Sequence, residues 1–216
     1  ANSFEVGVDL KFLKNRLGAE FTYYNQENKD QIIDLSVSGA SGFDQTVINA
    51  GLIQNKGIEI SLNGRPVQSK LFTWDATLNF ARNKNKIVEL YPGINVLQND
   101  VNTYSSQNIY LNSTVGQSFG NLIGPGYKID AATGKVLLGA DNMPLFDTAK
   151  DVGSVLPDFT GGLQNTFKIW KFDLGAMIDF QKGGQFMSWT KMLAAKSGQS
   201  AETAAINDKG FNVREP

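Results

Sequence analysis

The sequence predicts an all-β chain that forms a segment of a large antiparallel transmembrane β-barrel, with short turns at one end of the strands and long loops at the other. Three observations lead to this fold class: apolar residues at every second position, connections that are alternately short and long, and strands of about ten residues whose apolar sides carry no charge. The alternation occurs in six segments, at 4–12, 17–23, 58–63, 72–80, 159–169 and 172–181. Because two residues is the period of a β-strand, each segment has one apolar and one polar side.

The connections between the segments predict three hairpins. Short stretches at 13–16, 64–70 and 170–171 join the members of each pair, whereas long polar stretches at 31–56 and 81–158 separate the pairs. Neighbouring antiparallel strands joined by tight turns form hairpins. Hairpins with short turns at one end and long loops at the other are typical of outer-membrane barrels.

Strand length and charge favour a membrane barrel over a soluble fold. Ten residues at about 3.3 Å each span roughly 23 Å when they are tilted by about 45°, which matches an apolar band of about 25 Å. A lysine or arginine on the lipid side at mid-membrane would cost about 2–4 kcal/mol, and the apolar sides carry none. In a soluble sandwich the apolar side would instead face a core, and alternation alone does not say which side is inside.

Each segment is expected to face lipid with its apolar side and a wet lumen with its polar side. The residues predicted to face lipid are Phe4, Val6, Val8, Leu10, Phe12, Phe21, Tyr23, Ile58, Ile60, Leu62, Phe72, Trp74, Leu78, Phe80, Leu163, Phe167, Phe172, Leu174, Ile178 and Phe180. The opposite side carries the charges Glu5, Asp9, Lys11, Glu20, Glu59, Asp75, Lys168, Asp173 and Asp179. Phe72, Trp74, Phe159 and Phe172 lie near strand ends, where barrels have aromatic girdles.

The composition excludes several kinds of chemistry. The 216 residues include no cysteine and no histidine, which removes disulfides, zinc ribbons, thiol nucleophiles and the Ser-His-Asp triad. With 20 basic and 21 acidic residues the net charge is −1, and no basic patch indicates a nucleic-acid partner. No apolar run reaches the length of a transmembrane helix. We therefore expect no catalytic residue, metal site or cofactor.

The connecting segments hold the remaining candidate elements. The sequence predicts a long loop at 32–49, an extension of the fourth strand out of the membrane at 83–90, a small hairpin with a glycine turn at 127–138, a helix at 189–196 that ends near Gly198, and a second short helix that begins at 200–203. The glycines at 116–126 fit no phosphate-binding spacing. Asp141, Asp147 and Asp151 lack the spacing of a calcium loop.

Three aromatic residues in these segments are the candidates for ligand contact. Tyr104, Tyr110 and Trp189 have side chains of the kind that can stack on sugars or peptides, although packing within a loop is the commoner role of such residues.

The chain is expected to be incomplete as a barrel. We expect no signal peptide in residues 1–216, which end in a polar stretch. Since open sheet edges are not tolerated in lipid, the chain is expected to be part of a single, larger β-barrel domain whose other strands lie outside it.

Several stretches resemble known transporters. Residues 55–60 together with 72–87 resemble the barrel of TonB-dependent transporters. Residues 157–167, followed by 172–174 and 181–184, resemble the SusC/RagA branch of that family. The resemblance implies a barrel of about 22 strands around an internal plug, with short periplasmic turns and long extracellular loops.

The resemblance also implies a function and partners. It implies import of a bulky nutrient, an oligosaccharide or a peptide, driven by TonB across the outer membrane of a Bacteroidetes-type bacterium. It implies a SusD-like surface lipoprotein that covers the barrel. The plug, the TonB-binding segment and the final strands are expected to lie outside residues 1–216, so coupling and ligand residues cannot be carried over from the family.

Three other functions stay open on the sequence. A passive porin-like channel would use the same strands without a plug. A soluble β-sandwich binding module would bury the apolar side in a core. An outer-membrane hydrolase typically requires a histidine beside its nucleophile, and this chain has none.

Overall fold

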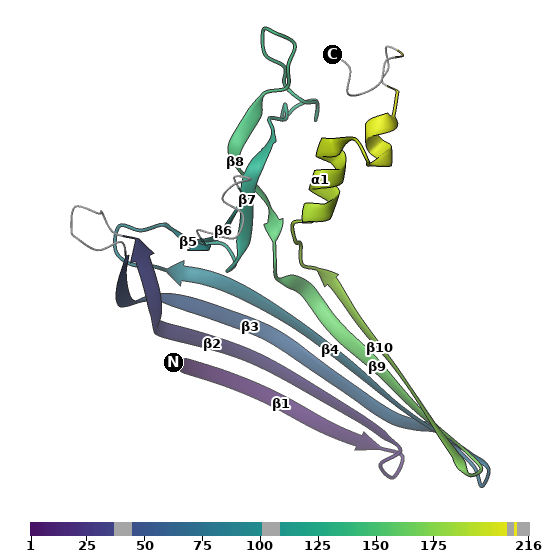
Figure 1. The fold of residues 1–216 in the computed structure, drawn as a ribbon. Helices are drawn as coiled ribbons and strands as arrows, with labels where there is room; N and C mark the ends of the chain where they lie inside the picture. The colour runs from purple at the N-terminus through teal and green to yellow at the C-terminus, as the bar shows by residue number, and fades with distance from the viewer. Residues whose placement is uncertain (37–44, 101–108, 207–209, 211–216) are drawn as a thin grey trace. The chain divides into compact units, whose positions relative to one another are not determined.

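The computed structural model describes residues 1–36, 45–100, 109–206 and 210. The chain forms two compact units, Ala1–Gln185 and Phe186–Pro216. The first unit consists of antiparallel strands in two sheets, and the second contains two short helices (Figure 1). The predicted all-β class is therefore confirmed.

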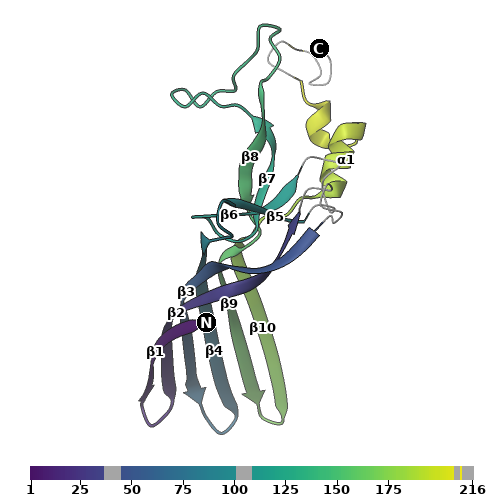
Figure 2. The same ribbon diagram turned by 90° about the vertical axis from the view of Figure 1, so that its left-hand side faces the viewer.

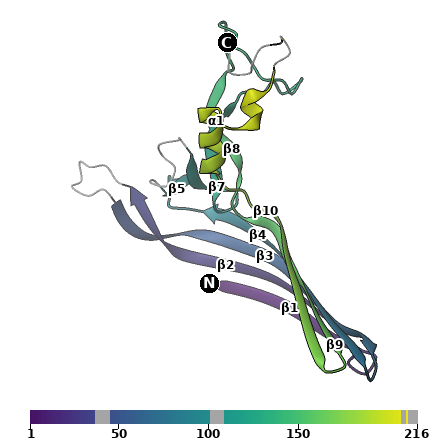
Figure 3. The same ribbon diagram turned by 45° about the vertical axis from the view of Figure 1, so that its right-hand side comes forward.

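The larger sheet contains six antiparallel strands in the order β1-β2-β3-β4-β9-β10. Its strands are β1 (Asn2–Phe12), β2 (Leu17–Ser36), β3 (Gln45–Gln68), β4 (Phe72–Glu89), β9 (Pro157–Ile169) and β10 (Phe172–Gly183). The turns that join β1 to β2, β3 to β4 and β9 to β10 lie at the same end of the sheet (Figures 2 and 3). All three predicted hairpins are thus confirmed.

The tight turns require unusual backbone conformations. Leu13, Lys14 and Asn15 all have positive φ angles, of 53°, 56° and 66°, which cost roughly 1–2 kcal/mol each for residues with a side chain. Arg16 offsets part of this cost, because its guanidinium donates hydrogen bonds to the carbonyl oxygens of Arg65 and Pro66 at 3.0 and 3.3 Å. The first turn is thereby fixed to the strand of the neighbouring hairpin.

Three strands extend well beyond the predicted segments. β2, β3 and β4 contain 20, 24 and 18 residues, and β2 pairs with β3 from Leu17↔Gly64 to Ser36↔Gln45. The predicted loop at 32–49 is therefore wrong at both of its ends. The predicted extension of the fourth strand is confirmed as far as Glu89, and its position outside a membrane stays a prediction. The alternation stops near residue 25, but the pairing of β2 with β3 continues, because main-chain hydrogen bonds do not depend on an apolar side.

A second sheet occupies much of the stretch expected to be a polar loop. Its strands, in the order β5-β6-β7-β8, are β5 (Val96–Asp100), β6 (Tyr110–Thr114), β7 (Asn121–Tyr127) and β8 (Phe146–Ser154). Within 81–158 the sequence predicted only the extension of the fourth strand and the small hairpin, and not this second sheet. The Ile129↔Val136 bridge and the φ of 68° at Gly134 confirm the small hairpin.

The two sheets share a small apolar core at the loop end of β4. Ile87 is fully buried, with 0% exposure, and packs with Ala50 and Leu90. Its backbone amide donates to the carbonyl of Gln117 at 2.9 Å, and its carbonyl accepts from the amide of Gly116 at 2.8 Å. These contacts anchor the segment around Gly116 to β4.

The unit Phe186–Pro216 contains the two predicted helices. α1 (Trp189–Ser197) begins at Ser188, whose hydroxyl accepts from the amide of Lys191 at 3.2 Å, and it ends at Gly198, which has a φ of 77°. A 3₁₀ helix at Ala201–Ala204 follows. Neither described helix is long and apolar enough to cross a membrane.

Candidate functional site

The strand register places every residue predicted to face lipid on one face of the six-stranded sheet. Along one row, Val8, Phe21, Ile60 and Phe80 occupy the same level on β1, β2, β3 and β4, and Phe180 continues the row on β10. We call this side the apolar face; it carries Phe4, Val6, Val8, Leu10, Phe12, Phe21, Tyr23, Ile58, Ile60, Leu62, Phe72, Trp74, Leu78, Phe80, Leu163, Phe167, Phe172, Leu174, Ile178 and Phe180.

The apolar face is strongly exposed in this chain. Phe4, Leu174 and Ile178 are 61%, 58% and 59% exposed. A soluble monomer rarely shows a continuous apolar patch of this extent. An apolar environment outside the chain is therefore needed to cover this face.

Aromatic rings collect at the turn end of the apolar face. Phe167 of β9 stacks on Phe72 and Trp74 of β4, with ring centroids 6.3 and 6.0 Å apart. The indole N–H of Trp74 donates to the Oδ1 of Asn165 at 3.0 Å. The ring centroid of Trp170, in the turn, lies 6.5 Å from that of Phe172. Trp170 was not among the predicted residues of this face because it lies between two alternating segments.

The opposite side, which we call the polar face, carries an excess of carboxylates. Lys11 pairs with Asp9 at 3.0 Å, Lys168 pairs with Asp173 at 4.0 Å, and Arg65 pairs with Asp75 at 2.7 Å. Four further carboxylates of this face form no ion pair among the described residues: Glu5, Glu20, Glu59 and Asp179. The polar face therefore has a negative surface that is suited to water, cations and hydrogen-bond donors.

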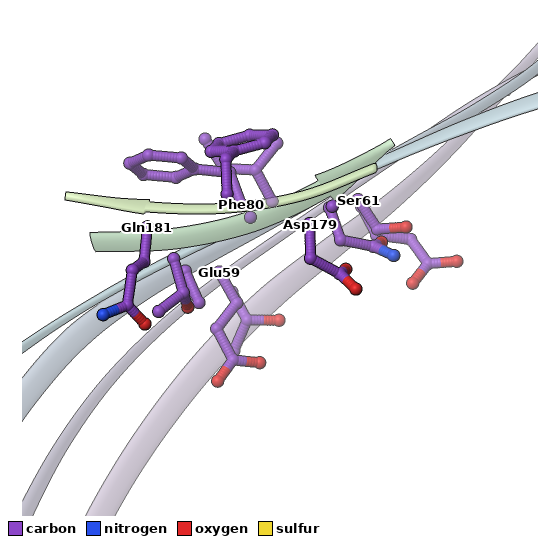
Figure 4. A pocket seen from close by; sticks show the side chains of 14 residues that line it. Glu59, Ser61, Phe80, Asp179 and Gln181 are labelled. Atoms are coloured by element: carbon purple, nitrogen blue, oxygen red, sulfur yellow. The ribbon is translucent and has the colours of Figure 1, made fainter. Parts of the chain in front are cut away.

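The middle of the polar face is hollowed by a concavity of about 690 Å³. Glu59, Ser61, Asp179 and Gln181 project to one side of the strands, and the ring of Phe80 projects to the other (Figure 4). Five strands, β2, β3, β4, β9 and β10, bring the polar side chains of the hollow together, although these strands come from distant parts of the sequence. The hollow is a shallow depression in the polar face, and hydrogen-bonding groups line it.

The predicted ligand-contact residues do not form one described site. Tyr110 begins β6 and pairs with Ile123, whereas Trp189 begins α1 in the other unit and is 38% exposed. Tyr104 lies outside the described residues. Their contact with a ligand stays a prediction.

Three acidic residues, Asp141 after the small hairpin and Asp147 and Asp151 of β8, bind backbone amides close to them in sequence. Asp141, Asp147 and Asp151 accept hydrogen bonds from backbone amides two residues further on, at 3.1, 3.1 and 3.0 Å. In the part of the chain that the structure describes, no group of acidic residues could hold a metal ion.

Asp130 has an electrostatic environment that can be tested by titration. Its Oδ1 accepts from the amide of Thr133 at 2.7 Å, the hydroxyl of Thr133 at 2.9 Å and the amide of Ala132 at 3.0 Å. These bonds lower the pKa of Asp130, and the amide of Thr133 contributes most. They stabilise the charged form, so this stabilisation of the turn is fully present above the ordinary carboxyl pKa and is lost as the pH falls through the lowered one.

Replacing Thr133 with valine should therefore raise the pKa of Asp130 part of the way to its ordinary value. The substitution removes the hydroxyl donor but keeps the backbone donor and the side-chain shape. Carbon-13 NMR of aspartate-labelled protein would follow the carboxyl signal through the titration. An unchanged pKa would show that the hydroxyl does not contribute; Thr148→Val, in β8, is the matched control.

Comparison with known proteins agrees with this two-faced wall. Residues 1–176 match the family model of the TonB dependent receptor-like β-barrel. TonB-dependent receptor P3 of Formosa agariphila is 29% identical over 223 residues, which cover 94% of this chain and 22% of the relative. TonB-dependent receptor SusC of Bacteroides thetaiotaomicron is 30% identical over 92 residues, 42% of this chain and 9% of the relative.

Solved structures give the same result. The RagAB peptide transporter matches with a TM-score of 0.66 and 26% identity, over 84% of this chain and 21% of that one. The RagAB peptide importer in its open-open state matches with a TM-score of 0.63 and 28% identity, over 84% of this chain and 20% of that one. This chain spans about a fifth of the length of P3 and of the RagAB chains. The predicted resemblance to SusC and RagA is confirmed, and the chain belongs to the TonB-dependent receptor-like β-barrel family.

Proposed function

We propose that this chain is a section of the barrel wall of an outer-membrane importer that takes up a bulky nutrient with energy from TonB. The observation that carries the proposal is the register, which sorts the strands into an exposed apolar face and a charged polar face. In such a wall the apolar face lies against lipid, and the polar face lines the lumen. The family match supports the coupling to TonB.

The proposed cargo is an oligosaccharide or a peptide, and the proposed partner is a SusD-like surface lipoprotein. The likeness to SusC and to the RagAB peptide transporter supports both parts of this proposal. The polar face supports a polar cargo, because hydrogen-bonding groups rather than apolar pockets line its hollow. Solute transport without chemical change agrees with the absence of cysteine and histidine from the sequence.

Nutrient uptake in the native host tests the proposal. Deletion of the gene should abolish uptake of one class of labelled oligosaccharide or peptide, and the full-length gene should restore it. The same gene should fail to restore uptake in a strain without TonB. A passive porin would instead keep its uptake in that strain.

The partner and the membrane location are tested by purification. The full-length protein should be extracted only with detergent and should carry a surface lipoprotein with it. Recovery in buffer alone as a monodisperse species would contradict the membrane location and would support the soluble β-sandwich. Recovery from the outer membrane without any lipoprotein would contradict the proposed partner.

A further inference from the structure

Basic side chains follow the apolar face on its loop side. Beyond the last apolar residues, three strands continue on the same face with cations: Lys56 on β3, Arg82, Lys84 and Lys86 on β4, and Lys182 on β10. All five are exposed. We call this set the basic rim.

The basic rim begins at the row of Arg82 and Lys182 and continues over the next two rows with Lys56, Lys84 and Lys86. Arg82 is 10 residues from Phe72, where β4 begins, and Lys182 is 10 residues from Phe172, where β10 begins. Lys56 is 12 residues from Gln68, where β3 ends. Ten residues at about 3.3 Å, tilted by about 45°, rise roughly 23 Å, which is close to the apolar band of about 25 Å. The rim therefore begins at the level of the lipid headgroups on the loop side.

The positive charge of the rim is not neutralised within the described part of the chain. None of its five cations forms an ion pair there, whereas Lys11, Arg65 and Lys168 of the polar face each have a carboxylate partner. Glu27, on the same face, accepts a hydrogen bond from the Nε2 of Gln54 at 3.3 Å.

The register adds repulsion within the rim. Lys56 lies directly opposite Lys84 across β3 and β4, and like charges in directly opposed positions destabilise a sheet. Arg82 lies opposite Ile58, one level nearer the membrane. An anion that contacts these cations together would relieve the repulsion.

We propose that the basic rim binds the phosphate groups of anionic lipids in the leaflet on the loop side of the barrel. Phosphate fits this surface because arginine contacts it with two donors in a fixed plane, and lysines contribute point charges around it. The position of the rim directly above the apolar face selects a phosphate that is carried by a lipid. This inference rests on the proposed placement of the apolar face in a membrane.

Lipid binding to the full-length protein tests the proposal. The protein in neutral-detergent micelles would be titrated with a short-chain phosphatidate and, separately, with phosphatidylcholine and inorganic phosphate, and the bound species would be counted by native mass spectrometry. Each cation near a charged lipid surface contributes roughly fivefold in affinity. The variant Lys56→Gln/Arg82→Gln/Lys84→Gln should therefore bind phosphatidate about a hundredfold more weakly.

A matched variant separates the rim from the total charge. Lys128→Gln/Lys135→Gln/Lys150→Gln removes the same charge from exposed and half-buried lysines beside and within the small hairpin and should bind phosphatidate as the wild type does. Equal binding by the rim variant and the wild type would overturn the proposal. So would equal binding of phosphatidate and phosphatidylcholine, or displacement of phosphatidate by an equal concentration of inorganic phosphate.

Failure of this proposal can be told apart from failure of the proposed function. Folding of each variant in the membrane is checked by the heat-dependent gel shift of intact barrels, and uptake of the labelled nutrient is measured in cells. Normal insertion and uptake with unchanged phosphatidate binding would overturn only the lipid site. Failure of the wild type to insert into membranes would overturn the membrane placement on which both proposals depend.

Discussion

Leu78→Arg will destabilise the membrane-inserted full-length protein by about 2–4 kcal/mol, because it places a charge on the lipid side near mid-membrane. Leu78 lies on the apolar face between Leu62 and Leu163, six residues after the start of β4. Guanidinium unfolding of the protein in lipid vesicles would measure the change in the free energy of unfolding.

The matched control is Asn79→Arg, on the next residue and the opposite face. Asn79 shares a row with Glu20 and Asp179, so an arginine there has carboxylates on its own face and water around it. Its cost should be within about 0.5 kcal/mol. Equal costs for the two variants would contradict the assignment of the faces.

A depth comparison distinguishes lipid from a protein core. Phe4→Arg, at the loop-side limit of the apolar face on β1, should cost only about 0–1 kcal/mol, since the cost of a charge falls toward the membrane interface. In a soluble sandwich the apolar face would be buried against another sheet, and the cost of the arginine would follow the burial of each position rather than its depth in a membrane. Similar costs at Phe4 and Leu78 would therefore favour the soluble alternative.

The two faces could be predicted from the sequence because they depend only on the period of the strand. Val6 and Val8 lie on the same face whatever strand they pair with. Which residues share a row could not be predicted in the same way. Arg65 and Pro66 lie at an irregularity where the pairing shifts from Gly64↔Ala76 to Val67↔Trp74, and this shift sets every contact between β3 and β4 on the turn side.

The smaller sheet could not be predicted for a related reason. β7 contains Gly124, Pro125 and Gly126, residues that are depleted in strands and normally indicate loops. The strand is held instead by pairing with β8, where Tyr127 lies opposite Phe146 and the register shifts twice. The segments predicted for β2 and β3 were also too short. Gln54 and Asn55 of β3, for example, lie where both faces carry polar residues and the alternation disappears.

The hollow illustrates both cases. Glu59 and Asp179 were predicted on the polar side of their own strands, and the structure places them there (Figure 4). Their convergence with Ser61 and Gln181 depends on β4 pairing with β9 across the long intervening stretch. No local signal in the sequence specifies that pairing.

Gly57→Ala should cost about 1–3 kcal/mol, the range of overpacking in a filled site. A Cβ at Gly57 would meet the phenol ring of Tyr24 and would lie 2.7 Å from the backbone carbonyl oxygen of Arg82. The backbone of β4 cannot move away without lengthening the bonds of its ladder with β3. Unfolding of the full-length protein in vesicles would again measure the change.

Gly175→Ala on β10 is the matched control, because it also lies on the polar face and a Cβ there would have no atom of this chain within 4 Å. Its cost should be near zero, or slightly favourable, since glycine in a strand loses more backbone freedom on folding than alanine. Removing the ring with Tyr24→Ala tests the cause. If the clash with Tyr24 carries the cost, Gly57→Ala should be less harmful in the Tyr24→Ala background, with a coupling of about 0.5–3 kcal/mol between the two sites. Additive costs would assign the whole effect to the backbone of Arg82, and a harmless Gly57→Ala would contradict the close packing of β2, β3 and β4 from which the wall is built.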